Sequence, residues 1–298
     1  SGEAMAGSAQ MKMRSWLFAP GDSDKKCSKA VDGLADIAIL DIEDAVAEEN
    51  KPRARAMVHD FLRDRNDGRE RIWVRINPLA GQHALADLAA VVPARPGGIM
   101  LPKAEGREDV ERLHRYLEAL EAAHGITVGS TAVIVLVTET AAGMFRTGDY
   151  VGAPRLAAMT WGAEDLADAL GASSNTNPDG SYGHTFELAR SLCLLGAAAA
   201  GVPAIETIQA DFRDLDGLKV RADMVRRAGY RGMLAIHPDQ VPVINAAFTP
   251  SADEIAHARE IVALFAANPG AGTIGWKGGM LDRPHLSRAQ QLLAQAGD

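Results

Sequence analysis

The sequence predicts a single (β/α)₈ TIM barrel with a helical C-terminal extension. A chain of 298 residues is long enough for one large α/β barrel or for two ordinary domains. Eight short apolar runs alternate with longer segments of helical periodicity. Strands that are apolar on both faces and separated by helices indicate a parallel sheet covered on both sides. Eight such units in this length favour a closed barrel over an open doubly wound sheet.

The candidate strands are spaced along most of the chain. In order, they are Ser15–Pro20, Asp36–Asp41, Arg71–Asn77, Gly98–Lys103, Thr131–Thr138, Leu156–Trp161, Pro203–Ile208 and Gly232–Ile236. Segments of helical periodicity or composition follow them, such as Arg107–Ala123 and Phe186–Gly201. We therefore expect residues 11–250 to form the barrel.

The two ends of the chain fall outside this pattern. Residues 1–10 are small and polar, and we interpret them as a cloning remnant or a disordered tail. Residues 251–298 exceed what a last barrel helix requires. They contain a helical stretch at Ala252–Ala267, a glycine-rich loop at Gly270–Gly279 and an amphipathic segment from Arg283 onward. Such an extension caps the barrel or reaches a neighbouring subunit.

Composition excludes some classes of function. Lys and Arg number 31 against 39 Asp and Glu, so the net charge is −8, which argues against a nucleic-acid or membrane-surface binder. No apolar run approaches the roughly 20 residues of a membrane span. Cys27 and Cys193 show no metal-binding or redox spacing. We interpret them as reduced thiols and expect a cytoplasmic location.

Polar side chains close most of the apolar runs, at the end of a barrel strand where active sites of this fold lie. They are Asp41, Glu43, Asp44, Arg75, Asn77, Lys103, Glu139, Glu164, Asp165 and His237. Glu139 and Asp165 follow neighbouring strands, which lie about 4.8 Å apart in a sheet. Two carboxylates that close favour a bound cation, and an oxygen-only pair suits Mg²⁺. The alternative is that both are ordinary solvated loop carboxylates.

Other polar positions leave more than one interpretation open. Arg75 interrupts an apolar strand and needs an anionic partner, either a structural one such as Asp41 or Glu43, or a substrate carboxylate. A cluster of lysines follows the Pro-Gly turn after the first strand, either holding phosphates or forming a solvated helix face. His237 precedes a proline and is expected to satisfy a turn. The loop 173–183 is a mobile lid or an inert excursion.

A series of motifs in a fixed order resembles the citrate lyase β-subunit-like proteins of the aldolase and citrate lyase superfamily. The resemblance runs from about Arg14 to the C-terminus. It is carried by LFAPGD (17–22), LDIEDAV (40–46), VRIN (74–77), MLPK (100–103), TETA (138–141), GAEDL (162–166), AIHP (235–238) and GMLDRP (279–284). Members of that family are barrels, commonly trimers, that act on thioesters of 2-hydroxy acids.

The resemblance implies roles for named residues. Glu139 and Asp165 match Mg²⁺ ligands, and Arg75 matches the residue that holds the carboxylate of a 2-oxo acid. Asp282 matches an acid/base aspartate that an adjacent subunit donates, which would give the extension 251–298 a purpose. The positions implied to bind the CoA-bearing cofactor are Phe18, Lys25, Lys29, Arg75, Ala163 and Ala235. The implied assembly is a homo-oligomer, a trimer or a dimer of trimers.

The resulting hypothesis is a Mg²⁺-dependent carbon–carbon lyase. It would cleave a malyl- or citramalyl-CoA into acetyl-CoA and a 2-oxo acid, with Asp282 exchanging a proton with the enolate carbon. The alternatives are a malyl-CoA thioesterase or malate synthase, and a citrate lyase subunit that needs partners. Pyruvate, glyoxylate and oxaloacetate remain open as the 2-oxo acid.

Overall fold

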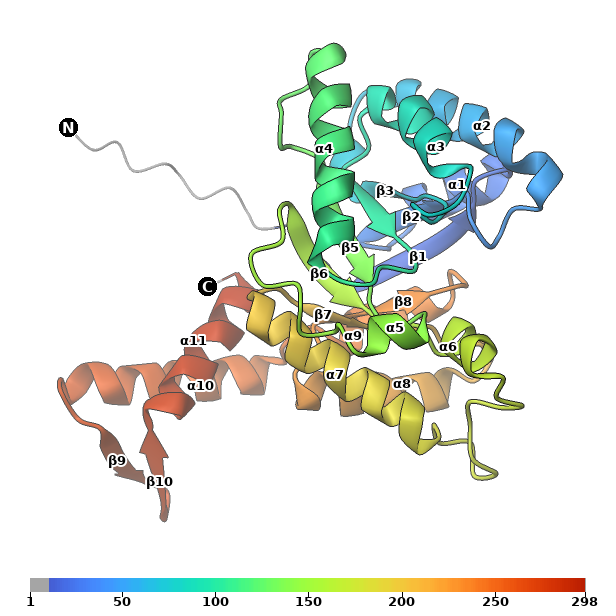
Figure 1. Cartoon of the computed structure of the whole chain (residues 1–298). Coiled ribbons are helices and arrows are strands. Elements are labelled where there is room, and N and C mark those ends of the chain that lie inside the picture. Colours follow the sequence, from blue (N-terminus) through green and yellow to red (C-terminus); the bar gives the residue numbers. More distant parts are fainter. Residues whose placement is uncertain (1–10, 298) are drawn as a thin grey trace, which may run out of the picture. The chain divides into compact units, whose positions relative to one another are not determined.

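The computed structural model describes residues 11–297, so the interpretation of residues 1–10 as a tag or tail lies outside the described part (Figure 1). The described chain divides into two compact units. One spans Met13–Asn245, and the other includes the chain from Ala246 onward.

The first unit is a closed barrel of parallel strands, in which β1 pairs with both β2 and β8. The strands are β1 (Ser15–Pro20), β2 (Ile37–Asp41), β3 (Ile72–Arg75), β4 (Gly98–Leu101), β5 (Ala132–Leu136), β6 (Leu156–Thr160), β7 (Ala204–Glu206) and β8 (Gly232–Ala235). All eight predicted strands are present, so the predicted (β/α)₈ fold is confirmed.

Close packing at the amino ends of the strands fixes the register of the barrel. The rings of Trp16 and Trp73 are fully buried and meet edge to face, with centroids 5.0 Å apart. A Cβ atom at Gly98, the register partner of Trp73, would lie 2.4 Å from the indole ring. Only glycine therefore allows β4 to pair with β3 beside this ring.

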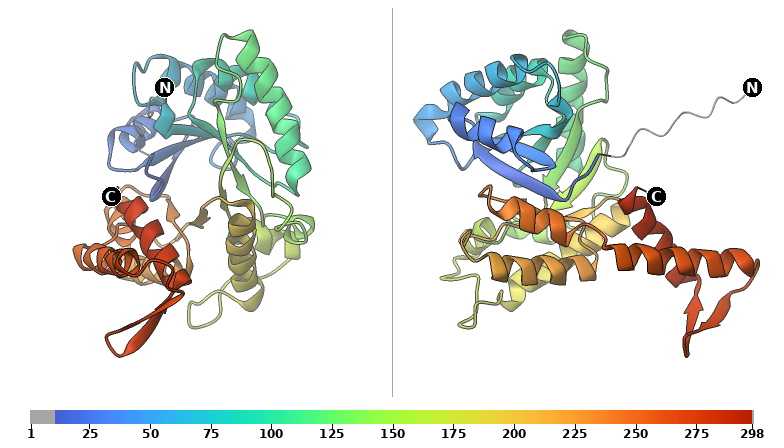
Figure 2. Two further views of the ribbon diagram at one scale, coloured as in Figure 1. Left: turned by 90° about the vertical axis from the view of Figure 1, so that its left-hand side faces the viewer. Right: turned by 180° about the vertical axis from the view of Figure 1, so that it is seen from behind.

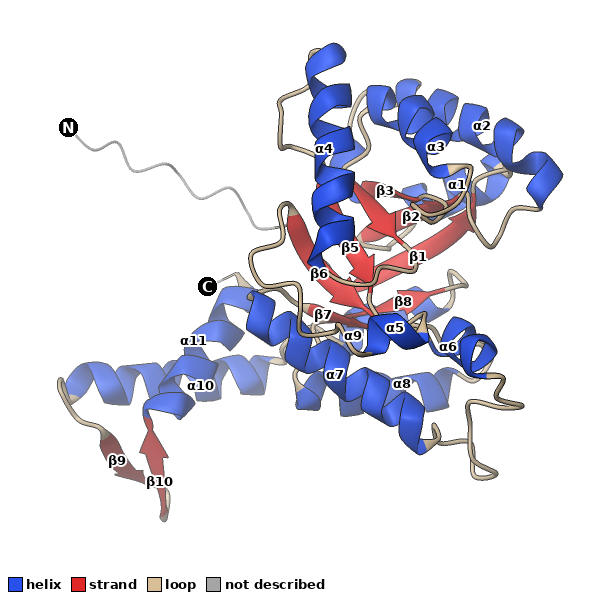
Figure 3. Ribbon diagram, viewed as in Figure 1, coloured by secondary structure: helices blue, strands red, loops and turns tan. Residues whose placement is uncertain are grey.

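Helices cover the outside of the strands (Figure 3). They are α1 (Asp24–Asp32), α2 (Lys51–Arg63), α3 (Ala84–Val91), α4 (Arg107–Ala123), α5 (Ala141–Met144), α6 (Ala163–Leu170), α7 (His184–Ala200), α8 (Leu215–Ala228) and α9 (Gln240–Ala247), with 3₁₀ turns at Glu48–Asn50, Arg69–Arg71 and Val92–Ala94. Within residues 11–297, no helix has the length and apolar character needed to cross a membrane. Both cysteines are buried and free, and burial raises the pKa of the Cys27 thiol to about 12.

The second unit consists of two helices joined by a β-hairpin (Figure 2). Its elements are α10 (Ala252–Ala267), β9 (Thr273–Trp276), β10 (Gly279–Asp282) and α11 (Arg283–Ala296). Its core is apolar and is formed by Ala258, Ile261, Phe265, Leu281 and Ala289. The prediction of a glycine-rich loop at Gly270–Gly279 is wrong. Lys277 and Gly278 both have positive φ, at 48° and 77°, and supply the tight two-residue turn of a hairpin.

A buried ion pair ties α4 to the start of β6. The Glu121 carboxylate is fully buried, and it accepts hydrogen bonds from the Arg155 guanidinium at 2.5 and 2.9 Å. The backbone N–H groups of Gly129 and Thr131 each donate to it at 3.0 Å. Burial opposes the charge, but Arg155 and these N–H groups outweigh it and lower the pKa of Glu121 to about 2.

The depressed pKa of Glu121 predicts a pH-dependent contribution to stability. The contribution is present above the unfolded pKa of about 4.5 and is lost as the pH falls toward 2. We expect Glu121→Gln to lower the free energy of unfolding by roughly 3 kcal/mol at pH 7 and by much less at pH 3. Urea unfolding at both pH values measures this. Glu118→Gln, at a position 42% exposed on the same helix, serves as the control, and an equal loss in both variants would contradict the prediction.

Candidate active site

A cluster of charged side chains lies at the carboxyl ends of five consecutive strands, β2 to β6. Asp41 and Arg75 are the last residues of β2 and β3. Lys103 follows β4, Glu139 follows β5, and Asp165 lies in the first turn of α6, directly after β6. Because all strands are parallel, these ends meet at one mouth of the barrel. The structure therefore brings these predicted site residues together, and their functional roles stay predictions.

Arg75 is held by Asp41 in a paired, two-bond contact. The two residues are register partners across β2 and β3. Nε donates to Asp41 Oδ1 at 2.9 Å, and Nη2 donates to Oδ2 at 2.6 Å. Burial alone would raise the pKa of Asp41, but the guanidinium holds that pKa below its usual value. Of the partners the sequence left open, Asp41 is therefore the structural one, and Nη1 of Arg75 takes no part in this pair.

Glu43 and Lys103 extend the network toward the metal candidates. Glu43 Oε1 lies 3.4 Å from Arg75 Nη1 but has no hydrogen-bond partner, although it is buried. Burial raises the pKa of Glu43. The Lys103 ammonium donates to Glu43 Oε2 at 3.0 Å and lies 3.4 Å from Asp165 Oδ1. The sequence placed both residues at strand ends and offered Glu43 as a possible partner of Arg75, but it assigned no role to Lys103.

The backbone of Lys103 is also specialised. Its φ is +53°, a conformation that non-glycine residues rarely adopt and that is often found at functional sites. This conformation accompanies a hydrogen bond of 2.8 Å from the Lys103 N–H to Glu139 Oε1. The same residue therefore supports one carboxylate with its backbone and faces two others with its side chain.

Glu139 and Asp165 form a directly interacting pair of carboxyl groups. Glu139 is only 3% exposed, and burial together with the hydrogen bond and charge of Asp165 raises its pKa well above the usual value. Burial also opposes ionisation of Asp165, but its contact with Glu139 and the nearby Lys103 ammonium keep its pKa below the usual value. One proton shared between two acids is the arrangement expected when no cation separates them.

The cluster as a whole has the charge of a divalent-cation site. With every group ionised, the four carboxylates oppose only two cations, Arg75 and Lys103, which leaves two negative charges. Among residues 11–297, no group of three or more His, Cys, Asp or Glu residues forms a complete metal-binding set. Two carboxylates with space for water and substrate oxygens are what Mg²⁺ accepts, whereas Zn²⁺ prefers three or four nitrogen or sulfur ligands. The residues present therefore fit Mg²⁺.

The comparisons with known proteins agree with this geometry. Residues 14–238 match the family model described as HpcH/HpaI aldolase/citrate lyase. The chain belongs to this family. The mitochondrial citramalyl-CoA lyase of Mus musculus is 33% identical over 95% of this chain and 86% of its own length. The (3S)-malyl-CoA thioesterase of Cereibacter sphaeroides is 32% identical, covering 95% of this chain and 94% of that protein.

A solved structure supports the same assignment. CitE from Mycobacterium tuberculosis, in complex with magnesium, acetoacetate and coenzyme A, superposes with a TM-score of 0.80. It is 34% identical and covers 96% of this chain and 99% of that one. The resemblance inferred from the motifs is thus confirmed, and the chain is a TIM-barrel enzyme of a lyase family.

The residues predicted to bind the CoA-bearing part, besides Arg75, lie on four elements. Phe18, on β1, sits under Arg75, whose guanidinium carbon is 4.8 Å from the ring centroid. Lys25 and Lys29 are exposed one helical turn apart on α1. Ala163 begins α6, whose first turn has no side-chain cap, and Ala235 ends β8. The structure brings Phe18 to the charged cluster, and the binding roles of these five positions and of Arg75 stay predictions.

Asp282 lies in the second unit, where it ends β10 and caps α11. Its carboxylate accepts from the His285 backbone N–H at 3.3 Å and contacts the His285 ring. The hydrogen bond with His285 lowers the pKa of Asp282. The expected acid/base role requires the opposite direction, which burial in a neighbouring subunit's site would have to supply. That role stays a prediction.

A second buried ionic network, which the sequence did not reveal, closes the end of β7. Fully buried Glu206 accepts from Arg190 at 2.6 Å, from Arg221 at 3.2 Å and from the Trp161 indole at 2.5 Å. The guanidinium carbons of Arg190 and Arg221 lie 5.1 and 5.0 Å from the centroid of the Tyr182 ring. A carboxylate inside the apolar run 203–208 was the available signal, like Arg75 in its own strand.

The Glu206 network also contacts the loop 173–183, which the sequence left open as a mobile lid or an inert excursion. Tyr182 ends the loop, and its hydroxyl accepts a hydrogen bond of 2.9 Å from Arg221. The loop is therefore anchored at its C-terminal end. His237 satisfies a turn, as predicted, because its Nδ1 accepts the Asp239 backbone N–H at 3.1 Å.

Proposed function

We propose that the protein is a Mg²⁺-dependent lyase that cleaves a malyl- or citramalyl-type CoA thioester into acetyl-CoA and a 2-oxo acid. The observation that carries the proposal is the pairing of buried Glu139 with half-buried Asp165 at the mouth of the barrel, where Lys103 contacts both residues. A cation in place of the shared proton relieves the repulsion between the two carboxylates. The 2-oxo acid would be glyoxylate from a malyl-type thioester or pyruvate from a citramalyl-type thioester; oxaloacetate would require a citryl-type thioester.

The metal would be held by Glu139 and Asp165. When bound, Mg²⁺ supplies Lewis-acid polarisation of the hydroxyl and carboxylate oxygens of the substrate. Lys103 keeps Glu139 in place through its backbone N–H and stays protonated, because the surrounding carboxylates raise its pKa against the effect of burial. The chain would thus supply a fixed, negatively charged binding site for the cation.

Arg75 would bind the carboxylate of the 2-oxo acid. Its Nε and Nη2 atoms are hydrogen-bonded to Asp41. Nη1 lies 3.4 Å from Glu43 Oε1, which has no hydrogen-bond partner, and is therefore the donor available to a substrate. Backbone N–H groups in the uncapped first turn of α6, from Ala163 to Asp165, add donors near the developing negative charge. Both groups are fixed before substrate arrives, which reduces the reorganisation that the reaction requires.

The CoA moiety would pass Phe18 and reach the exposed ammonium groups of Lys25 and Lys29, with Ala163 and Ala235 contributing backbone contacts. Asp282 of an adjacent subunit would protonate the enolate carbon of acetyl-CoA on cleavage and remove the same proton in the synthetic direction. This requires a homo-oligomer, for which we propose a trimer or a dimer of trimers. We also propose that residues 251–298 form the extension that completes the neighbouring site and that the enzyme is cytoplasmic.

A product assay tests the function. The purified protein is incubated with malyl-CoA or citramalyl-CoA in Mg²⁺ or in EDTA, and acetyl-CoA, free CoA and 2-oxo acid are quantified by chromatography. We expect acetyl-CoA and glyoxylate or pyruvate in equal amounts, and at least about a 100-fold lower rate in EDTA, since Lewis-acid stabilisation amounts to several kcal/mol. No turnover of either thioester would contradict the proposal and favour a subunit that needs partners.

The second candidate is hydrolysis of the thioester, which the similarity to a (3S)-malyl-CoA thioesterase favours. It would use the same metal site with a positioned water. Free CoA together with the intact hydroxy acid would identify it. Free CoA that appears only with acetyl-CoA and glyoxylate as substrates would instead identify a malate synthase.

A further inference from the structure

The second unit contains a histidine in direct contact with the proposed acid/base aspartate. Asp282 and His285 form a reciprocal cap at the start of α11. The Asp282 N–H donates to His285 Nδ1 at 3.1 Å, and the His285 N–H donates to Asp282 Oδ1 at 3.3 Å. The same Nδ1 also contacts Asp282 Oδ1 directly. One ring nitrogen therefore faces both a backbone donor and a carboxylate oxygen.

These two contacts of Nδ1 require opposite protonation states. Neutral His285 with its proton on Nε2 accepts the Asp282 N–H, but its lone pair then faces the carboxylate. When Nδ1 carries a proton, it donates that proton to Asp282 Oδ1. When Asp282 is protonated at Oδ1 instead, the carboxyl group donates to the bare Nδ1. A proton on either Nδ1 or Oδ1 therefore satisfies the direct contact between the two side chains.

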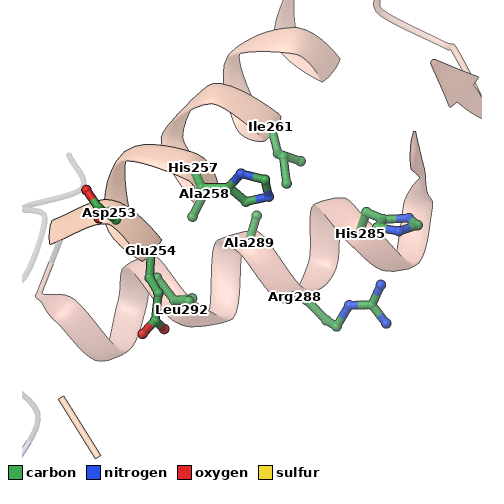
Figure 4. Close-up of a pocket in the computed structure, with 9 residues that line it drawn as sticks. All are labelled: Asp253, Glu254, His257, Ala258, Ile261, His285, Arg288, Ala289 and Leu292. Atoms are coloured by element: carbon green, nitrogen blue, oxygen red, sulfur yellow. The ribbon is translucent and has the colours of Figure 1, made fainter. Parts of the chain in front are cut away.

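The surroundings of the ring allow that proton to exchange with solvent. His285 is 36% exposed and lines a pocket of about 420 Å³ between α10 and α11 (Figure 4). The other titratable or charged groups that line it are Asp253, Glu254 and His257 of α10 and Arg288 of α11. Asp282 is 47% exposed, and its two contacts with His285 use Oδ1, which leaves Oδ2 for a substrate.

We propose that His285 is the positioning residue and proton donor for Asp282, and that the two residues work as one acid/base unit. In the cleavage direction, Nδ1 of the His285 imidazolium passes its proton to the Asp282 carboxylate, and Asp282 gives a proton to the enolate carbon. The neutral ring then takes up a proton from solvent, into which the substrate hydroxyl releases its own proton. In the synthetic direction each transfer reverses. The inference rests on the proposed function, since it needs Asp282 to act in catalysis.

The test separates proton transfer from helix capping. Gln at the third helical position still completes a capping box but cannot carry a proton, whereas Ala does neither. We expect His285→Gln and His285→Ala each to lower kcat by about 10- to 100-fold with KM within about twofold. Both variants should also slow exchange of the acetyl-CoA methyl protons with D₂O, and added imidazole should partly restore that exchange in His285→Ala. His257→Gln, in the same pocket, should behave as the wild type.

The outcomes distinguish failure of this inference from failure of the proposed function. Wild-type kcat and proton exchange in His285→Gln, with loss in His285→Ala only, would reduce His285 to a helix cap and overturn the inference. Full activity in Asp282→Asn would overturn it too, while leaving the lyase in place. A wild-type protein that turns over neither thioester would overturn the proposed function and the inference with it.

Discussion

Glu139→Gln is expected to abolish measurable Mg²⁺ binding and to lower kcat/KM for thioester cleavage by about 10³-fold or more. The substitution preserves shape but removes one of the two carboxylates that would hold the cation. A loss of about 4 kcal/mol in transition-state stabilisation, typical for a removed Lewis acid, gives this factor. Calorimetric titration with Mg²⁺ and the product assay measure the two effects.

Stability distinguishes this effect from unfolding. In EDTA the wild-type pair must share a proton or repel, so Glu139→Gln should melt at the same temperature as the wild type or slightly above it. The control is Glu164→Gln, because Glu164 is exposed and directly precedes Asp165. It should keep activity within about twofold, since surface carboxylates contribute little. Unchanged Mg²⁺ affinity in Glu139→Gln would contradict the assignment.

Arg75→Met is expected to produce the largest loss of stability in the barrel. It would leave the Asp41 carboxylate, only 1% exposed, without its cation. Removing one partner of a buried ion pair costs about 3–5 kcal/mol, which corresponds to a fall in Tm of roughly 10 °C for a unit of this size. Arg75→Lys should keep the charge but lose the paired geometry, so it should be folded and poorly active.

A double-mutant cycle tests whether the loss of stability comes from breaking the ion pair between Asp41 and Arg75. Asp41→Asn combined with Arg75→Met removes both charges, so the double variant should be less destabilised than the sum of the single variants by about 2 kcal/mol. Arg63→Met, at a position 61% exposed with two surface ion pairs, should change the free energy of unfolding by less than about 0.5 kcal/mol. Strict additivity at Asp41 and Arg75 would show that the pair is not energetically coupled.

The barrel was predictable because its signals are local. Each strand is a short apolar run, and parallel pairing carries the ends of those runs to one mouth. The sequence alone therefore predicts that Glu139 and Asp165 lie near each other. The paired contact of Asp41 with Arg75 was only one of two options, because it depends on register between β2 and β3, which side-chain chemistry does not specify.

Other parts of the site depend on backbone geometry and on distant elements. The positive φ of Lys103, which accompanies the contact of its N–H with Glu139, has no signature in the motif MLPK. The Glu206 network joins β7 to the residue that follows β6, to α7, to α8 and to a loop, so no sequence window contains it. In the extension, the five glycines between residues 270 and 279 suggested a loop, although Lys277 and Gly278 form a hairpin turn.

The most direct test of the account is a crystal structure of the protein grown with Mn²⁺ and a 2-oxo acid, with data collected at the manganese absorption edge. We expect one anomalous peak within coordination distance of Glu139 and Asp165, with the 2-oxo acid carboxylate against Arg75. A peak at other side chains, or none at saturating Mn²⁺ in well-ordered crystals, would contradict the central claim that this pair of carboxylates is the metal site.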